Sequence, residues 1–331
     1  MSRACIFGCA GPHLSRSEAA FFRDADPWGF ILFSRNVESP AQLRELTDRL
    51  RNTVGWRAPV LVDQEGGRVQ RLRPPHWRDW PPPLDHVCAA RDPVRAMWIR
   101  ARLMAEELGQ SGIDTNCAPT ADVARPDTHP FLRDRCLGSA PVQVAAAARA
   151  TAEGLLAGGV LPVVKHMPGH GRARVDSHLR RPVVSASRIE LESDFAPFRA
   201  LADLPLGMTA HILYEALGSR PATHEPAVIG LIRREIGFDG LLMTDDISME
   251  SLGGSIGERA ARAIAAGCDL VLHCNGETAE MSECAAALGP LSADAHRRAI
   301  AALALRRVPQ PVDIPALEAE LAELTRSPVR G

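Results

Sequence analysis

The segment VVKHMPGHGRARVDSHL, residues 163–179, concentrates side chains that can transfer protons or bind a metal. It holds His166, His170 and His178 together with Asp176. A histidine exchanges a proton near neutral pH, and an adjacent carboxylate fixes its tautomer and raises its basicity. Asp176 and His178 are spaced for such a pair, and the two glycines of PGHG permit the hinge motion of a mobile catalytic arm.

Two other interpretations of this segment stay open. A zinc site needs two or three ligands on rigid spacing, and His166 and His170 are four residues apart, as on one face of a helix. Pro168 and the glycines beside it argue against a regular helix. The third interpretation is a solvated loop without chemistry, so the partners of these residues must come from elsewhere in the chain.

Charged or titratable side chains also follow four short apolar runs. The runs are PVLV, VLPVV, PLGMT and GLLMT, and they are followed by Asp63, by Lys165 and His166, by Ala210 and His211, and by Asp245 and Asp246, respectively. In a parallel barrel the carboxyl ends of the strands meet on one face, where active sites form. We therefore expect these side chains to converge on one site, in which a strand-end aspartate acts as nucleophile.

The elements that must position these residues alternate along the chain between short apolar runs and longer amphipathic stretches. Seven runs have the buried character of strands in a parallel sheet covered on both faces: residues 4–8, 29–33, 59–62, 160–164, 205–209, 240–244 and 269–273. A weaker run, residues 113–119, is the candidate for an eighth strand. Helices are predicted over residues 39–55, 92–112, 139–159, 185–203, 225–238 and 255–267.

This order fits two α/β architectures. An open doubly wound sheet usually has a glycine-rich phosphate turn after its first strand, and GCAGPHLS lacks that pattern. About eight β/α units fit a (β/α)8 barrel in length, and no linker divides the 331 residues. We therefore predict one α/β domain, residues 1–331, a single (β/α)8 TIM-type barrel. The stretches 291–307 and 313–326 should form one or two terminal helices packed outside it.

Composition argues against several classes of partner. The formal charge of −2 gives no basic field for nucleic acid, and no apolar stretch approaches the ~20 residues of a membrane span. The first apolar run is too short for an export signal. The eight cysteines form no C-x-x-C pair, and several lie in apolar runs, as is typical of reduced thiols. We expect a cytoplasmic protein.

Several motifs, in order between residues 4 and 275, resemble the β-N-acetylhexosaminidases of glycoside hydrolase family 3. They include LVDQEGGRVQRL (61–72), VKHMPGHG (164–171), DSH (176–178) and GFDGLLMTDDISM (237–249). The resemblance is closest to the single-domain bacterial type that recycles cell-wall muropeptides. It implies a lone barrel that removes a non-reducing terminal β-linked N-acetylglucosamine with retention of configuration. It implies a monomer without metal or cofactor, whose partner is a small sugar substrate.

The resemblance also assigns roles residue by residue. The family's nucleophile matches Asp245, and its acid/base matches His178, with Asp176 as the dyad partner. The family's sugar-binding positions match Asp63, Arg71, Arg135, Lys165 and His166, and His211 matches a family histidine near the substrate. Lys165 and Arg71 would hold Asp63 ionised. Glu65 is expected to brace the glycine turn that follows it rather than to react.

The sequence departs from the family pattern in two places. Met167 stands where the family has Phe, an apolar exchange that a core should tolerate. The segment RDRCLG lacks the Ser and the aromatic residue that usually follow the family's arginine, so Arg133 competes with Arg135 for the sugar-binding role. Four arginines, at positions 172, 174, 180 and 181, either solvate the loop or favour an anionic aglycone.

Three rival functions stay open. A phosphorylase could use the same scaffold, because a histidine acid/base would not repel phosphate as a carboxylate would. A non-catalytic sugar-binding protein would need neither Asp245 nor the Asp176–His178 pair. A metal-dependent hydrolase is the third, and chelation of the metal would separate it from the others.

Overall fold

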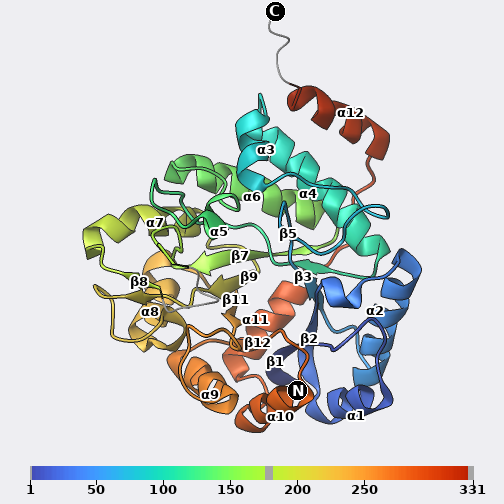
Figure 1. Ribbon diagram of the computed structural model, residues 1–331, viewed down its shortest axis with the longest axis vertical. Helices are drawn as coiled ribbons and strands as arrows, with labels where there is room; N and C mark the ends of the chain where they lie inside the picture. Colours follow the sequence, from blue (N-terminus) through green and yellow to red (C-terminus); the bar gives the residue numbers. More distant parts are fainter. Residues whose placement is uncertain (1, 176–181, 327–331) are drawn as a thin grey trace, which may run out of the picture.

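Eight parallel strands form a closed barrel at the centre of the computed structural model, which describes residues 2–175 and 182–326 (Figure 1). The strands are β1 (Arg3–Gly8), β2 (Pro27–Leu32), β3 (Val60–Val62), β6 (Thr115–Asn116), β7 (Leu161–Met167), β9 (Leu206–Thr209), β11 (Leu241–Asp246) and β12 (Leu270–His273). Each barrel strand pairs with the next one along the chain, and β12 closes on β1. The predicted fold class is confirmed, and the weak run 113–119 supplies its eighth strand.

The strands read as apolar throughout because both of their faces are buried. Ile6, Leu61 and Val163 point into the barrel, where they join one apolar cluster. Their neighbours, such as Phe7 and Val164, point outward and pack in a second cluster between the strands and the helices. Side chains that alternate between two apolar layers leave no polar face, so the period of two is hidden in the sequence.

The helices that cover the barrel begin at clear capping signals. The predicted ones are α2 (Pro40–Val54), α4 (Pro93–Gln110), α6 (Pro141–Ala157), α7 (Arg188–Ala200), α8 (Pro226–Leu231), which continues into a π-helical turn η3 (Ile232–Ile236), and α9 (Ile256–Ala266). Ser39, Ser187 and Ser255 each accept a backbone hydrogen bond in a capping box, which satisfies amide groups at the helix start. The helices α1 (Arg16–Ala25), α3 (Pro83–Ala89), α5 (Pro130–Arg133) and α10 (Thr278–Ala287) were not predicted.

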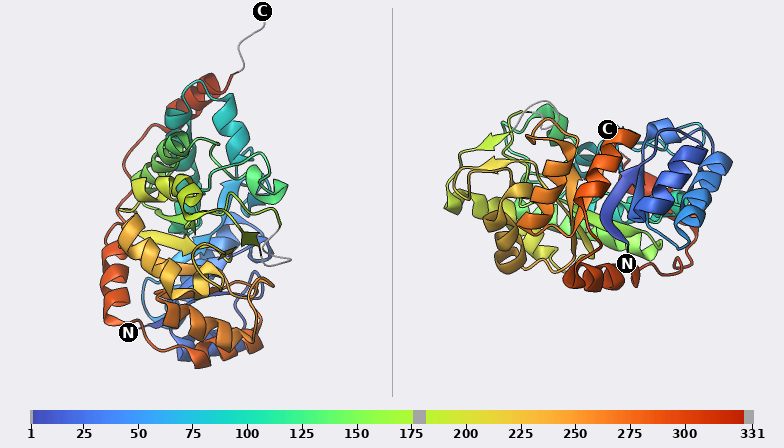
Figure 2. Two further views of the ribbon diagram at one scale, coloured as in Figure 1. Left: turned by 90° about the vertical axis from the view of Figure 1, so that its left-hand side faces the viewer. Right: turned by 90° about the horizontal axis from the view of Figure 1, so that it is seen from below.

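The sequence predicts that the C-terminal helices pack outside the barrel. Helix α12 (Ile314–Leu324) does so, with Leu317 in a cluster that includes Trp80 and Leu103. Helix α11 (Ala293–Leu303) instead lies across the amino-terminal end of the strands (Figures 1 and 2). Its small residues Ala295 and Ala299 join the cluster inside the barrel. The sequence predicted the helix but not the surface that α11 covers, because periodicity shows that a helix has an apolar face but not where that face packs.

Two short strand pairs build up the carboxyl-terminal rim. Strands β4 (Gln64–Gly66) and β5 (Val69–Gln70) form an antiparallel hairpin directly after β3. Its turn needs glycine at position 66, where φ is +113° and a Cβ would lie 2.0 Å from Arg100 Nη2. Strands β8 (Val183–Val184) and β10 (Leu213–Tyr214) pair in parallel on the other side of the rim.

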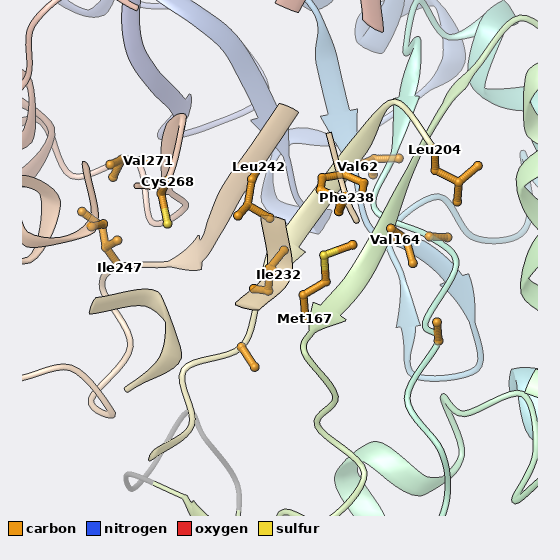
Figure 3. Close-up of a cluster of buried hydrophobic side chains, with 14 of the residues drawn as sticks. Val62, Val164, Met167, Leu204, Ile232, Phe238, Leu242, Ile247, Cys268 and Val271 are labelled. Atoms are coloured by element: carbon orange, nitrogen blue, oxygen red, sulfur yellow. The ribbon is translucent and has the colours of Figure 1, made fainter. Parts of the chain in front are cut away.

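Met167 lies in the outer apolar layer. It is the residue that departs from the family pattern in the K-H-x-P-G-H-G motif. It is fully buried, and Figure 3 shows its side chain extending toward Phe238.

All eight cysteines are unpaired, and only Cys88 is exposed. No helix of the described residues has the length and apolar character that a membrane-spanning segment needs.

Candidate active site

A cavity of about 640 Å³ opens at the carboxyl-terminal ends of the barrel strands. Its polar lining consists of Asp63, Arg71, Arg135, Lys165, His166, His170, Asp245 and Asp246. The wall also has apolar members, among them Phe33, Phe131 and Met208. The strand ends therefore bring together most of the residues that the sequence singled out, from β3, β7 and β11.

Asp63 lies at the edge of the cavity, one residue after β3. Its Oδ1 accepts a hydrogen bond from Lys165 Nζ at 2.9 Å, and its Oδ2 accepts one from Arg71 Nη2 at 3.1 Å. Burial alone would raise the pKa of Asp63, but the charges of Lys165 and Arg71 outweigh it and hold the pKa well below its usual range. The hairpin positions Arg71, because Gln64 Oε1 accepts its backbone amide at 3.0 Å. Asp63 is therefore an ionised acceptor at neutral pH.

Glu65 forms the second carboxylate of this network, 5% exposed and deeper than Asp63. Arg135 donates to both of its oxygens, at 2.9 and 2.8 Å, and Lys165 Nζ lies 2.6 Å from Oε1. Burial would raise its pKa, but Arg135 and Lys165 lower it to about 2. The expectation that Glu65 braces the glycine turn is wrong for its side chain. The turn is held by Arg100, whose Nη2 donates to the Glu65 carbonyl at 2.7 Å.

Lys165 is 2% exposed and stays charged because two carboxylates surround it. Burial would lower its pKa, but Asp63 and Glu65 raise the pKa above its usual value. Three cationic side chains, Lys165, Arg71 and Arg135, and the two acids therefore share a rigid arrangement in which each charge has an opposite partner. Such a network keeps its geometry without a ligand, since breaking any pair would leave a buried charge uncompensated.

His166, at the end of β7, is oriented by an aspartate that the sequence analysis missed. Asp122 is fully buried, and its Oδ2 lies 2.7 Å from His166 Nδ1. Its Oδ1 also accepts the backbone amides of His166 and His170, at 3.3 and 2.6 Å. An ionised carboxylate only accepts, so His166 carries a proton on Nδ1 and turns Nε2 toward Arg135, 3.4 Å away. The sequence signal that could have located Asp122 was its position a few residues after the weak eighth strand.

His170 packs edge-on against His166, with ring centroids 5.3 Å apart. Burial, followed by the neighbouring His166, lowers the pKa of His170 to about 4. It is therefore neutral at physiological pH. In the zinc interpretation His166 and His170 would share a metal. Among residues 2–175 and 182–326, no group of three or more His, Cys, Asp or Glu side chains is arranged to hold one.

Asp245 and Asp246 end β11, and both line the cavity, yet their surroundings differ. Asp246 is tied down: its Oδ1 accepts the backbone amides of Ser248 and Cys274 at 3.0 and 3.2 Å. Asp245 Oδ1 accepts the amide of Asp246 at 2.8 Å, and both side chains are partly exposed. The bonds of Asp246 fix the loop that follows β11, and both carboxylates border the cavity.

His211 is buried beside this pair but is not part of the cavity lining. Its Nε2 donates to the carbonyl of Asp246 at 3.0 Å, and its Nδ1 lies 2.7 Å from Thr223 Oγ1. Burial lowers the pKa of His211, despite the opposing effect of Asp245. A neutral ring with both nitrogens engaged fixes the backbone that presents Asp245. The histidine that was expected near the substrate therefore lies behind the carboxylates.

The two arginines that compete for the sugar-binding role, Arg133 and Arg135, lie in different surroundings. Arg135 is 7% exposed and lines the cavity, whereas Arg133 lies on the surface of α5 and donates to the Pro126 carbonyl at 3.4 Å, so placement favours Arg135. Asp176 and His178 lie outside the described residues, so their roles stay predictions.

Comparison with known proteins identifies the family of the chain. Residues 13–307 match the family model described as the glycosyl hydrolase family 3 N terminal domain. The chain is 40% identical over 281 residues to a β-hexosaminidase of Alkalilimnicola ehrlichii, which covers 82% of this chain and 80% of that protein. It is 38% identical over 288 residues to a β-hexosaminidase of Methylococcus capsulatus, with 84% of each chain covered.

Among solved structures, the chain resembles NagZ from Neisseria gonorrhoeae in complex with N-trifluoroacetyl-D-glucosamine. The TM-score is 0.87 at 30% identity, and the match covers 98% of both chains. It also resembles a family 3 β-N-acetylglucosaminidase of a Paenibacillus species, with a TM-score of 0.84 at 28% identity. That match covers 97% of this chain and 67% of the other.

Proposed function

The chain belongs to glycosyl hydrolase family 3 and is a glycoside hydrolase of the β-hexosaminidase class, and from that premise we propose its reaction and substrate. The proposed enzyme is a single-domain, cytoplasmic, monomeric exo-β-N-acetylglucosaminidase. It removes the non-reducing terminal N-acetylglucosamine from cell-wall muropeptides with retention of configuration, as part of peptidoglycan recycling. It uses neither metal nor cofactor.

One observation carries the proposal: Asp245 and the cation-bound Asp63 line the same cavity, from opposite parts of the strand ring. A retaining glycosidase needs a carboxylate that attacks the anomeric carbon and separate groups that hold the sugar. Asp245 has one oxygen engaged by the Asp246 amide, and this bond orients the carboxylate. The network around Lys165 supplies the fixed hydrogen-bonding groups.

In the proposed first step Asp245 attacks the anomeric carbon and the bond to the aglycone breaks. His178, held by Asp176, protonates the departing oxygen. In the second step His178 takes a proton from water, which attacks the glycosyl ester and releases Asp245. Asp176 and His178 are supported by the D-S-H motif and by the family, and the described residues contain neither.

The proposed sugar-binding groups are Asp63, Arg71, Arg135, Lys165 and His166. Asp63 is ionised and keeps acceptor capacity for sugar hydroxyls after its bonds to Lys165 and Arg71. Asp63 is therefore proposed to accept hydrogen bonds from the sugar, and the cationic groups are proposed to donate to it. His211 is proposed to act on the sugar only through the backbone at Asp246 that it fixes.

Trapping the covalent intermediate tests this mechanism. The protein is incubated with a 5-fluoro N-acetylglucosaminyl donor and digested, and the labelled peptide is identified by mass spectrometry. We expect label on Asp245. Label on Asp246 or on another residue would overturn the assignment of the nucleophile.

Product analysis tests the reaction class separately. An aryl β-N-acetylglucosaminide is incubated in phosphate and in a buffer without phosphate, and the sugar product is identified. Free N-acetylglucosamine in both buffers is expected of the hydrolase. A sugar 1-phosphate would instead establish a phosphorylase, and absence of turnover would favour a binding protein.

A further inference from the structure

A second polar cavity, of about 890 Å³, lies at the amino-terminal end of the barrel. Its charged lining consists of Arg44, Arg51, Arg57, Arg307, Asp48 and Asp114. Asp114 directly precedes β6, and Val160, also in the lining, directly precedes β7. Because these residues stand before their strands, the cavity faces away from the catalytic one.

The buried acid of this cavity, Asp114, is shared by several neighbours. Asp114 Oδ1 accepts the Val60 amide at 2.9 Å. Its Oδ2 accepts from Arg51 Nη2 at 3.0 Å and from Arg306 Nη1 at 2.9 Å. One negative charge thus serves two guanidinium groups and does not neutralise the other arginines of the cavity.

The outer arginines of the cavity are poorly neutralised. Arg44 Nε lies 3.6 Å from Asp48 Oδ2, and both side chains are more than half exposed. The side chains of Arg57 and Arg307 make no hydrogen bond or ion pair with the residues described here, although both line the cavity. Arg44 also donates to the Gly109 carbonyl, at the carboxyl end of α4, at 3.2 Å. Arg57 and Arg307 have no such bond to a helix end among the described residues.

The excess of positive charge can be counted. Five arginines, including Arg306, surround the cavity with two carboxylates, which leaves three cationic charges without an acidic partner there. The carboxyl ends of α2, α4 and α6 reach this face and contribute about half a negative charge each, so about one and a half positive charges remain. Burial, and then the charges of Arg57 and Arg306, lower the pKa of Arg51 against the effect of Asp114, which fits such crowding.

We propose that this cavity is a binding site for a phosphate-bearing small anion, either inorganic phosphate or a phosphate monoester. A phosphate group matches the remaining charge, and guanidinium groups donate to its oxygens in pairs. The site is separate from the catalytic cavity and does not depend on the proposed reaction.

Calorimetric titration of the full chain tests the site. The probes are inorganic phosphate and glucose 6-phosphate, with acetate as an anion control, at constant ionic strength and pH 7.5. Saturating N-acetylglucosamine is present throughout, so that phosphate does not enter the catalytic cavity. We expect saturable binding of both phosphates and none of acetate. Tighter binding of glucose 6-phosphate identifies an ester as the ligand, and equal affinity identifies the phosphate group alone.

Paired variants locate the binding. The double variant Arg57→Gln/Arg307→Gln should weaken phosphate binding by about tenfold or more, since it removes two charge-assisted donors. The matched control, Arg23→Gln/Arg220→Gln, removes the same charge from exposed positions elsewhere and should leave affinity unchanged. Both variants should keep the hydrolysis rate. The proposal is overturned if no phosphate binds saturably, if the cavity variant binds normally, or if both variants lose affinity equally.

Discussion

The two ends of the barrel each contain a strand-end aspartate bound by two cations, and they use it differently. At the carboxyl end, Asp63 takes one bond on each oxygen, from Lys165 and Arg71, and borders an open cavity. At the amino end, Asp114 accepts three bonds, one of them from a backbone amide, and is 6% exposed. The two aspartates differ in how many of their acceptor sites are occupied by the protein and in their access to a ligand. Asp63 can still accept a hydrogen bond from a ligand, whereas Asp114 connects neighbouring loops.

The largest effect should come from the carboxyl end, at Asp245. The variant Asp245→Asn should lower kcat for an aryl β-N-acetylglucosaminide by about 10⁴-fold or more, because it removes the nucleophile. Steady-state kinetics measures this, and binding of N-acetylglucosamine by calorimetry controls for folding. Activity within tenfold of the parent protein would refute the role of Asp245.

Lys165→Met should have the next largest effect. It leaves Asp63 and Glu65 buried without their shared cation, and we expect kcat/KM to fall by about 100-fold or more, equivalent to about 3 kcal/mol. Arg51→Met is the matched change at the other end, since it removes one cation from Asp114. Kinetics per folded molecule should be unchanged in Arg51→Met. Equal losses of kcat/KM in the two variants would contradict the conclusion that only the carboxyl end of the barrel takes part in catalysis.

Asp114→Asn should affect stability rather than catalysis. Arg51 and Arg306 would then lack their buried counter-charge, and the free energy of unfolding should fall by about 3 kcal/mol. Urea denaturation followed by circular dichroism measures the change. The kcat/KM of the folded variant should stay within twofold, and a larger loss would show that the ends are coupled.

The two arginines of the α5 region allow a smaller, sharper test. Arg135→Gln should lower kcat/KM by about 30-fold, or about 2 kcal/mol, because it removes charge-assisted hydrogen bonds at the cavity. Arg133→Gln removes the same charge from the surface and should have no effect. The reverse result would assign the sugar contact to Arg133.

The prediction with the smallest effect per unit of the measured variable is a dependence of stability on pH. The pKa of His170 is lowered to about 4, so between pH 6.5 and 4 the unfolded chain binds more protons at this residue than the folded chain. Stability should therefore fall as pH decreases through that range, by up to about 1.4 kcal/mol per pH unit for this histidine. The depressed pKa of Glu65, about 2, adds a further loss only below about pH 4.5.

His170→Gln provides the comparison for this slope. Urea denaturation at pH 7, 6 and 5 should give a smaller change of unfolding free energy in the variant than in the parent protein. The slope is compared rather than the absolute stability, so a general loss from the substitution does not matter. An unchanged slope would show that His170 is not the titrating group.

Much of the fold could be predicted because local chemistry determines it. The apolar runs located all eight barrel strands, including the short β6. Helix α1 was missed although its signal was present, since Ser15 and Glu18 form a capping box. The position of α11 was not predictable, because an alanine-rich face fits either a helix layer or the end of a barrel.

The site was predictable where a residue directly follows a strong strand. This rule located Asp63, Lys165 and Asp245. It missed Asp122, because β6 is only two residues long and the aspartate lies six residues beyond it. The partners of Glu65 were also hidden, since its bonds to Arg135 span 70 residues and depend on tertiary packing.

The packed interior of the barrel makes the catalytic cavity a dead end. Inward side chains such as Ile6 and Leu61 fill the ring of strands, and Ala295 and Ala299 of α11 cover its amino-terminal end. A ligand must enter and leave through the opening at the carboxyl-terminal face, so the part that is bound deepest leaves last. This geometry agrees with the proposed attack at the end of a sugar chain, because only the terminal sugar can reach the bottom of the cavity.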